Sequence, residues 1–363
     1  MTPLARELAA LIAAEGPISV ARYMGLCLGH PRHGYYMTRD PFGAGGDFIT
    51  APEISQMFGE LVGLWCAQAW LDMGSPSPVR LVELGPGRGT LMADALRAAR
   101  AVPTFRASLD VHMVEMSPVL RARQQARLAD AGVPVSWHAD LGDVPDGPAI
   151  VIANEFFDAL PVAHFVRAGD GWHERRIGLD AAGRLVFGLD PHPARGVMTS
   201  LPARPGDILE RLDHPLLHAL PARLAAQGGA ALVIDYGHAQ SGLGETLQAL
   251  REHKPVDPLA DPGEADLTAH VDFAALARAA LAAGARAFGP MTQGDFLTRL
   301  GIEARAARLK QAPGADPAAI DAALARLTGP GPDGMGELFK VLAMVHPAVE
   351  AVPGFASGEE FRR

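Results

Sequence analysis

Glycines alternate in the segment LVELGPGRGTL, residues 81–91, directly after an apolar run. Gly85, Gly87 and Gly89 can take backbone dihedrals that are closed to residues with a Cβ atom, and they let a ligand approach the main chain. The pattern predicts a strand that turns sharply into a helix, whose N-terminus carries partial positive charge. We therefore expect a nucleotide-binding turn, with Glu83 beside the ligand at the carboxyl end of the strand.

The spacing of these glycines indicates which nucleotide would bind. A dinucleotide fingerprint needs G-x-G-x-x-G, whereas this chain has G-x-G-x-G followed by Thr90. An acid such as Glu83 would repel phosphate and suit a ligand that carries an amino group or a sulfonium. The motif therefore favours S-adenosyl-L-methionine over NAD or ATP as the cofactor. A glycine-rich turn without a ligand is the structural alternative.

Acids also end the next two predicted strands. In DVHMVEMSP, residues 110–118, Glu115 closes an apolar strand, and Ser117 with the following proline is typical of a helix start. A carboxylate at the end of the second strand accepts hydrogen bonds from ribose hydroxyls in doubly wound nucleotide folds. Asp140, after the strand at residues 135–138, is placed to contact an adenine amino group. The alternatives are a solvated acid for Glu115 and a turn residue for Asp140.

The residues for chemistry are predicted in ANEFFDALPV, residues 153–162. The fourth strand ends at Asn154, and Glu155 and Asp158 follow at a spacing that puts both carboxylates on one face of a helical turn. Such a turn would face the pocket. If both acids instead cap a helix, their role is structural.

Methyl transfer to arginine would explain a need for several acids. A guanidinium arrives protonated and the methyl donor is itself a cation, so carboxylates must balance two positive charges in one site. Asp47, Glu53, Glu155 and Asp158 are the acids in the predicted pocket segments. One of them could orient the guanidinium while another helps to remove its proton.

The elements around these motifs follow an α/β pattern. Four strands separated by helices or loops are predicted at residues 79–84, 110–114, 135–138 and 149–153. Residues 163–189 alternate apolar and polar side chains and predict antiparallel strands. The α/β pattern then resumes with helices near 216–226 and 272–283 and strands at 231–237 and 337–346. We expect residues 240–270 to form a long polar loop.

Composition excludes several classes of protein. The 363 residues are 48% hydrophobic with a net charge of -9 and have no basic run, which argues against nucleic acid as a partner. Cys27 and Cys66 lack metal or redox spacing, and the 13 histidines show no ligand spacing, so no metal site is expected. The longest apolar stretches are too short to cross a bilayer, so no membrane insertion is expected.

Eight segments together resemble a known family. They are GPISVARYM, GHPRHGYYMTRDPFG, GDFITAPEISQMFGE, LVELGPGRGTL, ANEFFDALPV, LVIDYGH, PGEADLTAHVDF and MGELFKVL, and they cover residues from about 16 to 342. The chain resembles the S-adenosylmethionine-dependent methyltransferase family that includes the mitochondrial complex I assembly arginine methyltransferase. The resemblance implies a class I, Rossmann-like, doubly wound α/β fold. It also implies methylation of arginine in a subunit of respiratory complex I as the protein substrate.

The resemblance also assigns residues and domains. It implies that the cofactor pocket is lined by Thr50, Glu53, Gly85, Gly87, Glu115 and Asn154. Asp47, Glu155 and Asp158 would lie nearer the acceptor, and His270 in DLTAHVDF is a further candidate there, although a lone histidine is more often structural. We expect residues 1–78 to be a helical extension that contributes a pocket loop. Residues 79–363 would form the methyltransferase domain, with an antiparallel insertion on the substrate side at about 160–215.

The start of the family-like sequence predicts where the protein works. Family-like sequence begins by residue 16, from which we expect a homologue without a transit peptide that works in the cytoplasm.

An assembly chaperone, or a methyltransferase with another protein or small-molecule acceptor, stays open as an alternative function. An NAD oxidoreductase is disfavoured by the glycine spacing. The oligomeric state is left undetermined.

Overall fold

The computed structural model describes residues 1–39, 50–331 and 333–362. Its larger lobe is built on a mixed sheet with the strand order β15-β16-β10-β5-β2-β3-β4. Strands β10, β5, β2, β3 and β4 run parallel to one another, whereas β16 is antiparallel to both β10 and β15. The bounds are β2 (Val79–Leu84), β3 (Leu109–Val114), β4 (Val135–His138), β5 (Ala149–Asn154), β10 (Gly229–His238), β15 (Arg286–Thr292) and β16 (Phe339–Val345).

Strand order places a crevice at one edge of this sheet. From β2 the chain adds β3 and β4 on one side and then returns to add β5 on the other side of β2. Open α/β sheets bind ligands at such a reversal, outside the carboxyl ends of the strands. The short strand β14 (Val271–Asp272) pairs in parallel with the carboxyl end of β10. The edge beyond β2, β3, β5 and β10 is therefore where a site is expected.

Both faces of the sheet are covered by helices, which is why its strands read as apolar runs. Alternate residues enter different cores: Leu81 and Ile150 join one face, and Val82 and Val151 join the other. The first face carries α5 (Gln56–Asp72), α6 (Thr90–Ala98), α7 (Pro103–Ser108), α11 (Gln293–Arg299), α12 (Ile302–Leu309) and α13 (Pro317–Thr328). The second face carries α9 (Leu216–Gln227) and α10 (Phe273–Ala282).

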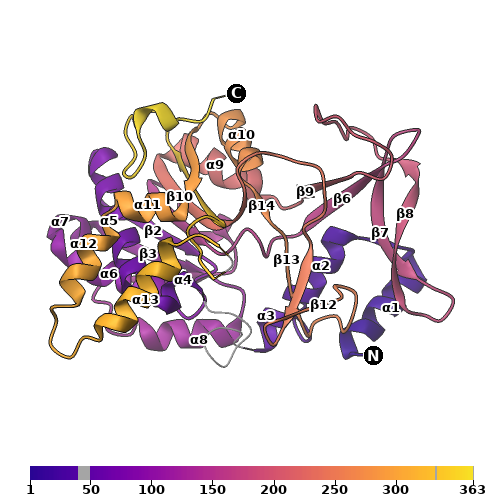
Figure 1. Cartoon of the computed structure of the whole chain (residues 1–363), viewed down its shortest axis with the longest axis horizontal. Coiled ribbons are helices and arrows are strands. Elements are labelled where there is room, and N and C mark those ends of the chain that lie inside the picture. Colours follow the sequence, from indigo (N-terminus) through magenta and orange to yellow (C-terminus); the bar gives the residue numbers. More distant parts are fainter. Residues whose placement is uncertain (40–49, 332, 363) are drawn as a thin grey trace.

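A smaller lobe lies beside the larger one, at the right of Figure 1. It combines the N-terminal helices α1 (Pro3–Glu15), α2 (Val20–Gly29) and α3 (Tyr35–Thr38) with strands from the middle of the chain around a third core. One sheet contains β1 (Ile18–Ser19), β6 (Val162–Arg167), β7 (Trp172–Leu179), β8 (Leu185–Pro193) and β9 (Ile208–Leu212). A second sheet contains β11 (Gln248–Arg251), β12 (Lys254–Val256) and β13 (Asp266–Thr268).

The remaining helical segments of the described residues lie between these elements or near the C-terminus. They are α4 (Ala51–Ile54), α8 (Pro118–Arg127), η1 (Ala99–Ala101), η2 (Leu141–Asp143) and η3 (Ser357–Glu359). Within residues 1–39, 50–331 and 333–362, no helix has the length and hydropathy needed to span a bilayer.

Several predicted elements agree with the structure and others do not. The first four parallel strands and the antiparallel insertion are confirmed. The prediction of a polar loop at 240–270 is wrong, because β11 and β13 pair there and bury Leu267 against the N-terminal helices. The segment before residue 78 divides between two cores: α1 and α2 belong to the smaller lobe, while α5 packs on the large sheet.

Candidate functional site

A cavity of about 620 Å³ lies between the two lobes at the carboxyl ends of the sheet strands. Nine of the predicted site residues line it: Thr50, Gly85, Gly87, Glu115, Ser117, Asp140, Glu155, Asp158 and His270. Asp47 lies outside the residues that the structure describes. The cavity is therefore where most of the predicted cofactor and acceptor residues come together.

The glycine turn forms one wall of this cavity. Gly85, Gly87 and Gly89 all have positive φ angles, of 60°, 54° and 75°. A Cβ atom at Gly85 would stand 2.5 Å from the ring of Phe156, and Gly89 is the left-handed residue before the first turn of α6. Only glycine satisfies both demands at residue 85 without strain, as the motif predicted. Gly89 shapes the turn but is not part of the cavity wall.

Glu115 is held at the end of β3 beside this turn. One of its carboxylate oxygens accepts the N–H of Ser117 at 2.8 Å, and the other accepts the side-chain amide of Gln124 at 3.1 Å. The same amide nitrogen donates to the carbonyl of Gly87 at 2.7 Å. Burial raises the pKa of Glu115, which these hydrogen bonds oppose. Gln124 thus ties the acid to the glycine turn, a role that no sequence motif indicated.

Ser117 and Asp140 both make the local contacts of helix starts. The hydroxyl of Ser117 accepts the N–H of Leu120 at 3.3 Å at the start of α8. The carboxylate of Asp140 accepts the N–H of Gly142 at 2.7 Å and caps η2. Ser117 therefore begins a helix, as predicted, and Asp140 has the turn role that was its alternative interpretation. Both residues also line the cavity.

Glu83 is not placed as the electrostatic interpretation requires. Its side chain is 3% exposed and is absent from the described wall of the cavity, where Leu84 stands instead. Successive side chains of a strand point to opposite faces, so a shift of one residue decides which of them meets a ligand. Burial raises the pKa of Glu83 to about 8. The raised pKa leaves Glu83 with less negative charge near neutral pH than an ordinary carboxylate, and the repulsion of phosphate by Glu83 stays a prediction.

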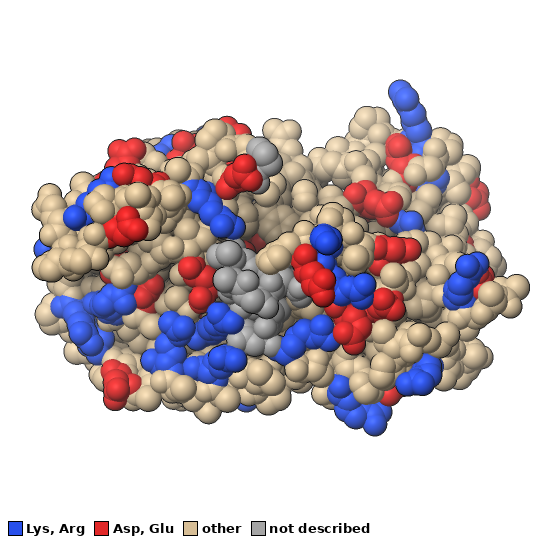
Figure 2. Space-filling view, turned by 60° about the horizontal axis from the view of Figure 1, so that its bottom comes forward, with Lys and Arg blue, Asp and Glu red and all other residues tan. Residues whose placement is uncertain are grey.

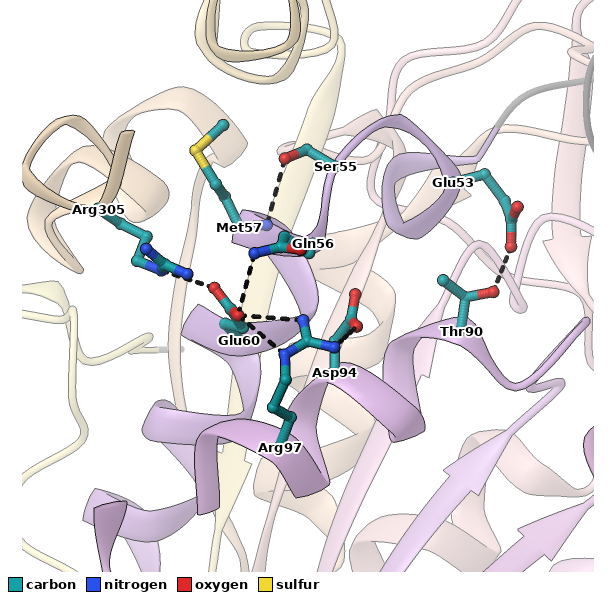
Figure 3. Close-up of polar contacts among 9 residues, drawn as sticks. All are labelled: Glu53, Ser55, Gln56, Met57, Glu60, Thr90, Asp94, Arg97 and Arg305. Atoms are coloured by element: carbon teal, nitrogen blue, oxygen red, sulfur yellow. Dashed lines mark hydrogen bonds and ion pairs between the residues drawn. The ribbon is translucent and has the colours of Figure 1, made fainter. Parts of the chain in front are cut away.

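Glu53 contacts the end of the glycine turn from outside the cavity. Its carboxylate accepts a hydrogen bond from the hydroxyl of Thr90 (Figure 3). It also lies 3.9 Å from the guanidinium of Arg88. Thr90 is the first residue of α6, so this contact joins α4 to the end of the turn. The structure does not bring Glu53 itself to the described cavity wall.

A buried carboxylate joins three helices nearby. Glu60 of α5 is 7% exposed and accepts hydrogen bonds from Arg97 of α6 at 3.0 and 3.1 Å and from Arg305 of α12 at 2.6 Å (Figure 3). Asp94 pairs with Arg97 at 2.7 Å. These contacts stabilise the helical layer behind the glycine turn rather than the cavity itself.

The predicted helical turn after β5 has a different conformation. Glu155 has a φ of 51°, and residues 155–158 form a tight turn outside any helix. The fully buried carboxylate of Asp235 accepts the N–H groups of Phe156, Phe157 and Asp158 at 3.1, 2.9 and 3.2 Å. Asp235 therefore sets the position of the turn. It ends the apolar run of LVIDYGH, so the strand-end rule that selected Glu115 could have found it.

Burial raises the pKa values of both acids of this turn towards neutral pH. It raises the pKa of Glu155 to about 7, although the N–H of Ala51 donates to its carboxylate at 2.8 Å. It raises the pKa of Asp158 to about 6, against a hydrogen bond from Tyr236. Asn154 donates to Glu155 at 3.2 Å and supports this acid, but it is not part of the described wall.

His270 enters the cavity from the segment between β13 and β14. Its backbone N–H donates to the hydroxyl of Thr246 at 2.7 Å, and Thr246 in turn hydrogen bonds with Glu210. The ring lies edge-on to Tyr236, with centroids 5.4 Å apart. Burial lowers the pKa of His270, so the imidazole is mostly neutral at neutral pH.

Acids are the charged side chains of the mostly apolar cavity wall. Of its described lining residues, five are carboxylic acids and none is lysine or arginine; the acids are Glu115, Asp140, Glu155, Asp158 and Asp266. Asp and Glu side chains also gather on the surface of the smaller lobe, to the right of the grey residues in Figure 2. The described residues hold no group of three or more His, Cys, Asp or Glu that could bind a metal ion. The arrangement suits a cationic ligand.

The fold and this site define a class of enzyme. Residues 61–291 match the family described as "Putative S-adenosyl-L-methionine-dependent methyltransferase", and the chain belongs to this family. It is an S-adenosyl-L-methionine-dependent methyltransferase with an α/β fold and a mixed central sheet.

Individual proteins are similar to this chain over most of its length. The chain is 42% identical to the mitochondrial protein arginine methyltransferase NDUFAF7 homolog of Drosophila melanogaster, over 94% of this chain and 84% of the relative. It is 40% identical to human mitochondrial NDUFAF7, over 84% of this chain and 75% of the relative. A crystal structure from Burkholderia thailandensis that contains S-adenosyl-homocysteine superposes with a TM-score of 0.84 at 31% identity, covering 99% and 95% of the two chains.

These relatives also correct the predicted location. We expected a cytoplasmic protein, but the curated relatives are named mitochondrial, which contradicts that expectation. The position at which family-like sequence begins does not determine the compartment in which a protein works.

Proposed function

We propose that this enzyme transfers a methyl group to the guanidinium of an arginine in a protein substrate, a subunit of respiratory complex I during its assembly. The observation that carries the proposal is the cavity wall, with five carboxylic acids and no lysine or arginine among its described residues. An arginine side chain and the methyl donor are both cations, and such a wall offsets the cost of removing both from water. The relatives' names as protein arginine methyltransferases support the same acceptor.

The topology of the sheet supports a more specific fold and a division into domains. We infer a class I, Rossmann-like, doubly wound sheet with the site at the reversal between β2 and β5, which the strand order supports. Residues 79–363 form the methyltransferase domain, with the insertion at about 160–215 on the substrate side. Residues 1–78 form the extension, which contributes Tyr36, Met37 and Thr50 to the cavity wall.

The residues present fit the proposed cofactor. Gly85 is a position where a Cβ would overlap Phe156, and Gly87 also has positive φ, so the main chain is open to close approach by a ligand. Glu115 would hold the ribose hydroxyls, and Asp140, Ser117 and Thr50 would line the rest of the nucleoside end. Glu53, Glu83, Gly89 and Asn154 would act through their neighbours. When bound, S-adenosyl-L-methionine supplies a methyl group activated by its sulfonium.

At the acceptor end, Glu155 and Asp158 perform two tasks. A carboxylate can bind a guanidinium through two parallel N–H···O bonds, which fixes the direction of the nucleophilic nitrogen. The second carboxylate accepts the proton that this nitrogen loses, and a pKa of about 6 to 7 makes these acids stronger bases than an ordinary carboxylate. Asp47 and His270 are assigned to the same end, with a neutral imidazole available as a hydrogen-bond partner.

A labelling experiment tests this function. The purified enzyme is incubated with methyl-labelled S-adenosyl-L-methionine and a lysate from cells that lack it, in parallel with Asp158→Asn and with Asp130→Asn, an exposed acid outside the site. We expect label in protein with the wild type and Asp130→Asn, and little with Asp158→Asn. Label only in small molecules would refute a protein substrate. Labelling unaffected by Asp158→Asn would refute the proposed acceptor site.

The same variant separates the enzyme from an assembly chaperone. If complex I assembles normally in cells whose only copy is a folded Asp158→Asn protein that transfers no methyl groups, a binding role explains assembly. If assembly fails together with methylation, the proposed reaction is required for it.

A further inference from the structure

A tyrosine and an aspartate of the smaller lobe meet inside the cavity. The hydroxyl of Tyr36, on α3, donates to the carboxylate of Asp266, on β13, at 2.8 Å. Both residues line the cavity, and Asp266 is 3% exposed. The two residues are 230 positions apart in the chain, so only the fold brings them together.

The segment that carries Asp266 is fastened to the N-terminal helices at several points. Tyr23 donates to the carbonyl of Pro258 at 2.7 Å, and Thr2 donates to the carbonyl of Pro262 at 2.9 Å. At Gly263, with a φ of 83°, a Cβ atom would stand 2.3 Å from the carbonyl oxygen of His33. These contacts hold the backbone before β13 in one place, and β13 itself pairs with β11.

The segment that follows Asp266 contacts the turn that carries Asp158. The N–H of Ala269 donates to the backbone carbonyl of Asp158 at 2.9 Å, so the chain just after β13 is joined directly to the turn after β5. Tyr36, Asp158 and Asp266 all line the same cavity. Burial raises the pKa of the Tyr36 phenol most, and the charges of Asp266 and Asp158 raise it further.

Each carboxylate has a tyrosine partner. Tyr36 donates to Asp266 and Tyr236 hydrogen bonds with Asp158, whose Oδ1 is buried without a partner among the described residues. A tyrosine hydroxyl occupies one lone pair of an ionised carboxylate, which has about four acceptor sites. The tyrosines thus orient both acids at the cavity wall, and Oδ1 of Asp158 can accept a further N–H donor there.

We propose that Asp266, oriented by Tyr36, is the second half of the acceptor site and binds the guanidinium edge opposite to the one that Asp158 binds. This inference rests on the proposed function and names a subsite for it. A planar group with five donors can meet carboxylates on two sides, whereas an ammonium group on a flexible stem is a point charge. The acceptor site is thus completed only between the lobes, which selects arginine over lysine.

Binding of small acceptor analogues tests the subsite. The probes are N-acetyl-L-arginine amide and its neutral isostere N-acetyl-L-citrulline amide, titrated by NMR into protein saturated with S-adenosyl-homocysteine. For Asp266→Asn we expect roughly 10- to 100-fold weaker binding of the arginine probe, the loss typical of a charge-assisted hydrogen bond. Affinity for S-adenosyl-homocysteine should be unchanged. Glu264→Gln is the matched control, because Glu264 is a partly exposed acid two residues away that pairs with Arg39.

Tyr36→Phe is the second variant, in case Asp266→Asn does not fold. It keeps the ring and removes only the hydroxyl, so we expect roughly threefold or more weaker binding of the arginine probe. Wild-type affinity for this probe in folded Asp266→Asn, or in Tyr36→Phe if the first variant is unfolded, would overturn the subsite. A wild-type protein that does not distinguish the arginine probe from citrulline would instead refute the proposed function.

Discussion

The carboxylate of Asp235 accepts the backbone N–H of Asp158 at 3.2 Å, and so β10 determines where a candidate acceptor acid stands. The same oxygen accepts the N–H groups of Phe156 and Phe157, while the other oxygen accepts that of Tyr236 at 2.9 Å. All four partners are donors, and hydrogen bonds of this kind oppose the effect of burial and of the neighbouring carboxylates, which together raise the pKa of Asp235 well above its ordinary value. The turn that carries Glu155 and Asp158 is thus organised by a residue of the neighbouring strand.

Replacing this residue should disturb the turn. In Asp235→Asn the amide oxygen can take only one of the two acceptor positions, so the amide nitrogen would face at least one buried N–H at a cost of about 1–3 kcal/mol. We expect that loss in the free energy of unfolding by urea, together with a larger loss in methyl transfer than the stability change explains. Asp130→Asn serves as control. Wild-type activity in Asp235→Asn would show that the turn does not depend on these bonds.

The glycine turn should tolerate no side chain at residue 85. A Cβ at Gly85 would meet the ring of Phe156 at 2.5 Å and would occupy a left-handed conformation. Such a conformation costs roughly 1–2 kcal/mol, so Gly85→Ala should bind S-adenosyl-homocysteine about 5- to 30-fold more weakly. Calorimetry measures this affinity. Gly188→Ala, a strand glycine with open space around it, should bind as the wild type does; equal affinities for the two variants would contradict the turn's role.

Activity should depend on pH through the two acids of the turn. The pKa values of Glu155 and Asp158, about 7 and about 6, mean that the carboxylates needed for a guanidinium form as the pH rises through this range. We expect kcat/KM for the protein acceptor to rise between about pH 5.5 and pH 7.5. Measurement at constant ionic strength separates this effect from screening. A flat profile would mean that neither acid must be ionised.

Stability of the ligand-free enzyme should change in the opposite direction. Glu83, Glu155 and Asp158 have pKa values raised from 4.5, 4.5 and 3.8 to about 8, 7 and 6. Between the ordinary and the raised values the native state binds more protons than the unfolded state, so the contribution of these groups to the free energy of unfolding falls as the pH rises. Urea titrations at about pH 6 and pH 8 test this prediction.

The Glu83→Gln variant checks the largest of these shifts. A neutral amide avoids burying a charge at high pH, so the variant should lose less stability than the wild type between about pH 6 and pH 8. An equal loss in both proteins would show that Glu83 does not hold a proton in this range.

The charged network behind the turn gives a separate prediction. Glu60→Gln removes the carboxylate that receives Arg97 and Arg305, and because both arginines are partly exposed we expect a loss of about 1–3 kcal/mol in the free energy of unfolding. Affinity of the folded protein for S-adenosyl-homocysteine should stay within about twofold of the wild type. Asp72→Asn, at the exposed end of the same helix, is the control. A large loss of affinity without loss of stability would contradict this structural role.

The sequence was most informative where structure is local. Buried parallel strands are apolar runs bounded by turn residues, so four of them, together with the glycine turn between β2 and α6, could be predicted. Glu115 and Asp140 were found because acids that follow such strands reach the same edge of the sheet. Glu83 was misplaced because the pattern locates a strand end but does not decide which face receives a given side chain.

The contacts that complete the acceptor end are long-range. Tyr36 and Asp266 are 230 positions apart in the chain, and neither stands in a spacing that indicates chemistry. The segment at 240–270 looked like a polar loop because its strands are short, and its burial depends on helices near the N-terminus. Such pairs follow from tertiary packing, which local patterns do not encode.

The chemical identity of the methylated residue decides whether the methyl acceptor is an arginine guanidinium. Protein labelled by the wild-type enzyme with methyl-labelled S-adenosyl-L-methionine is digested to peptides and analysed by tandem mass spectrometry, with amino-acid analysis of a parallel acid hydrolysate. We expect methylated arginine that is lost with Asp158→Asn and retained with Asp130→Asn. Label on lysine, on a carboxyl group or on another side chain would refute arginine as the acceptor.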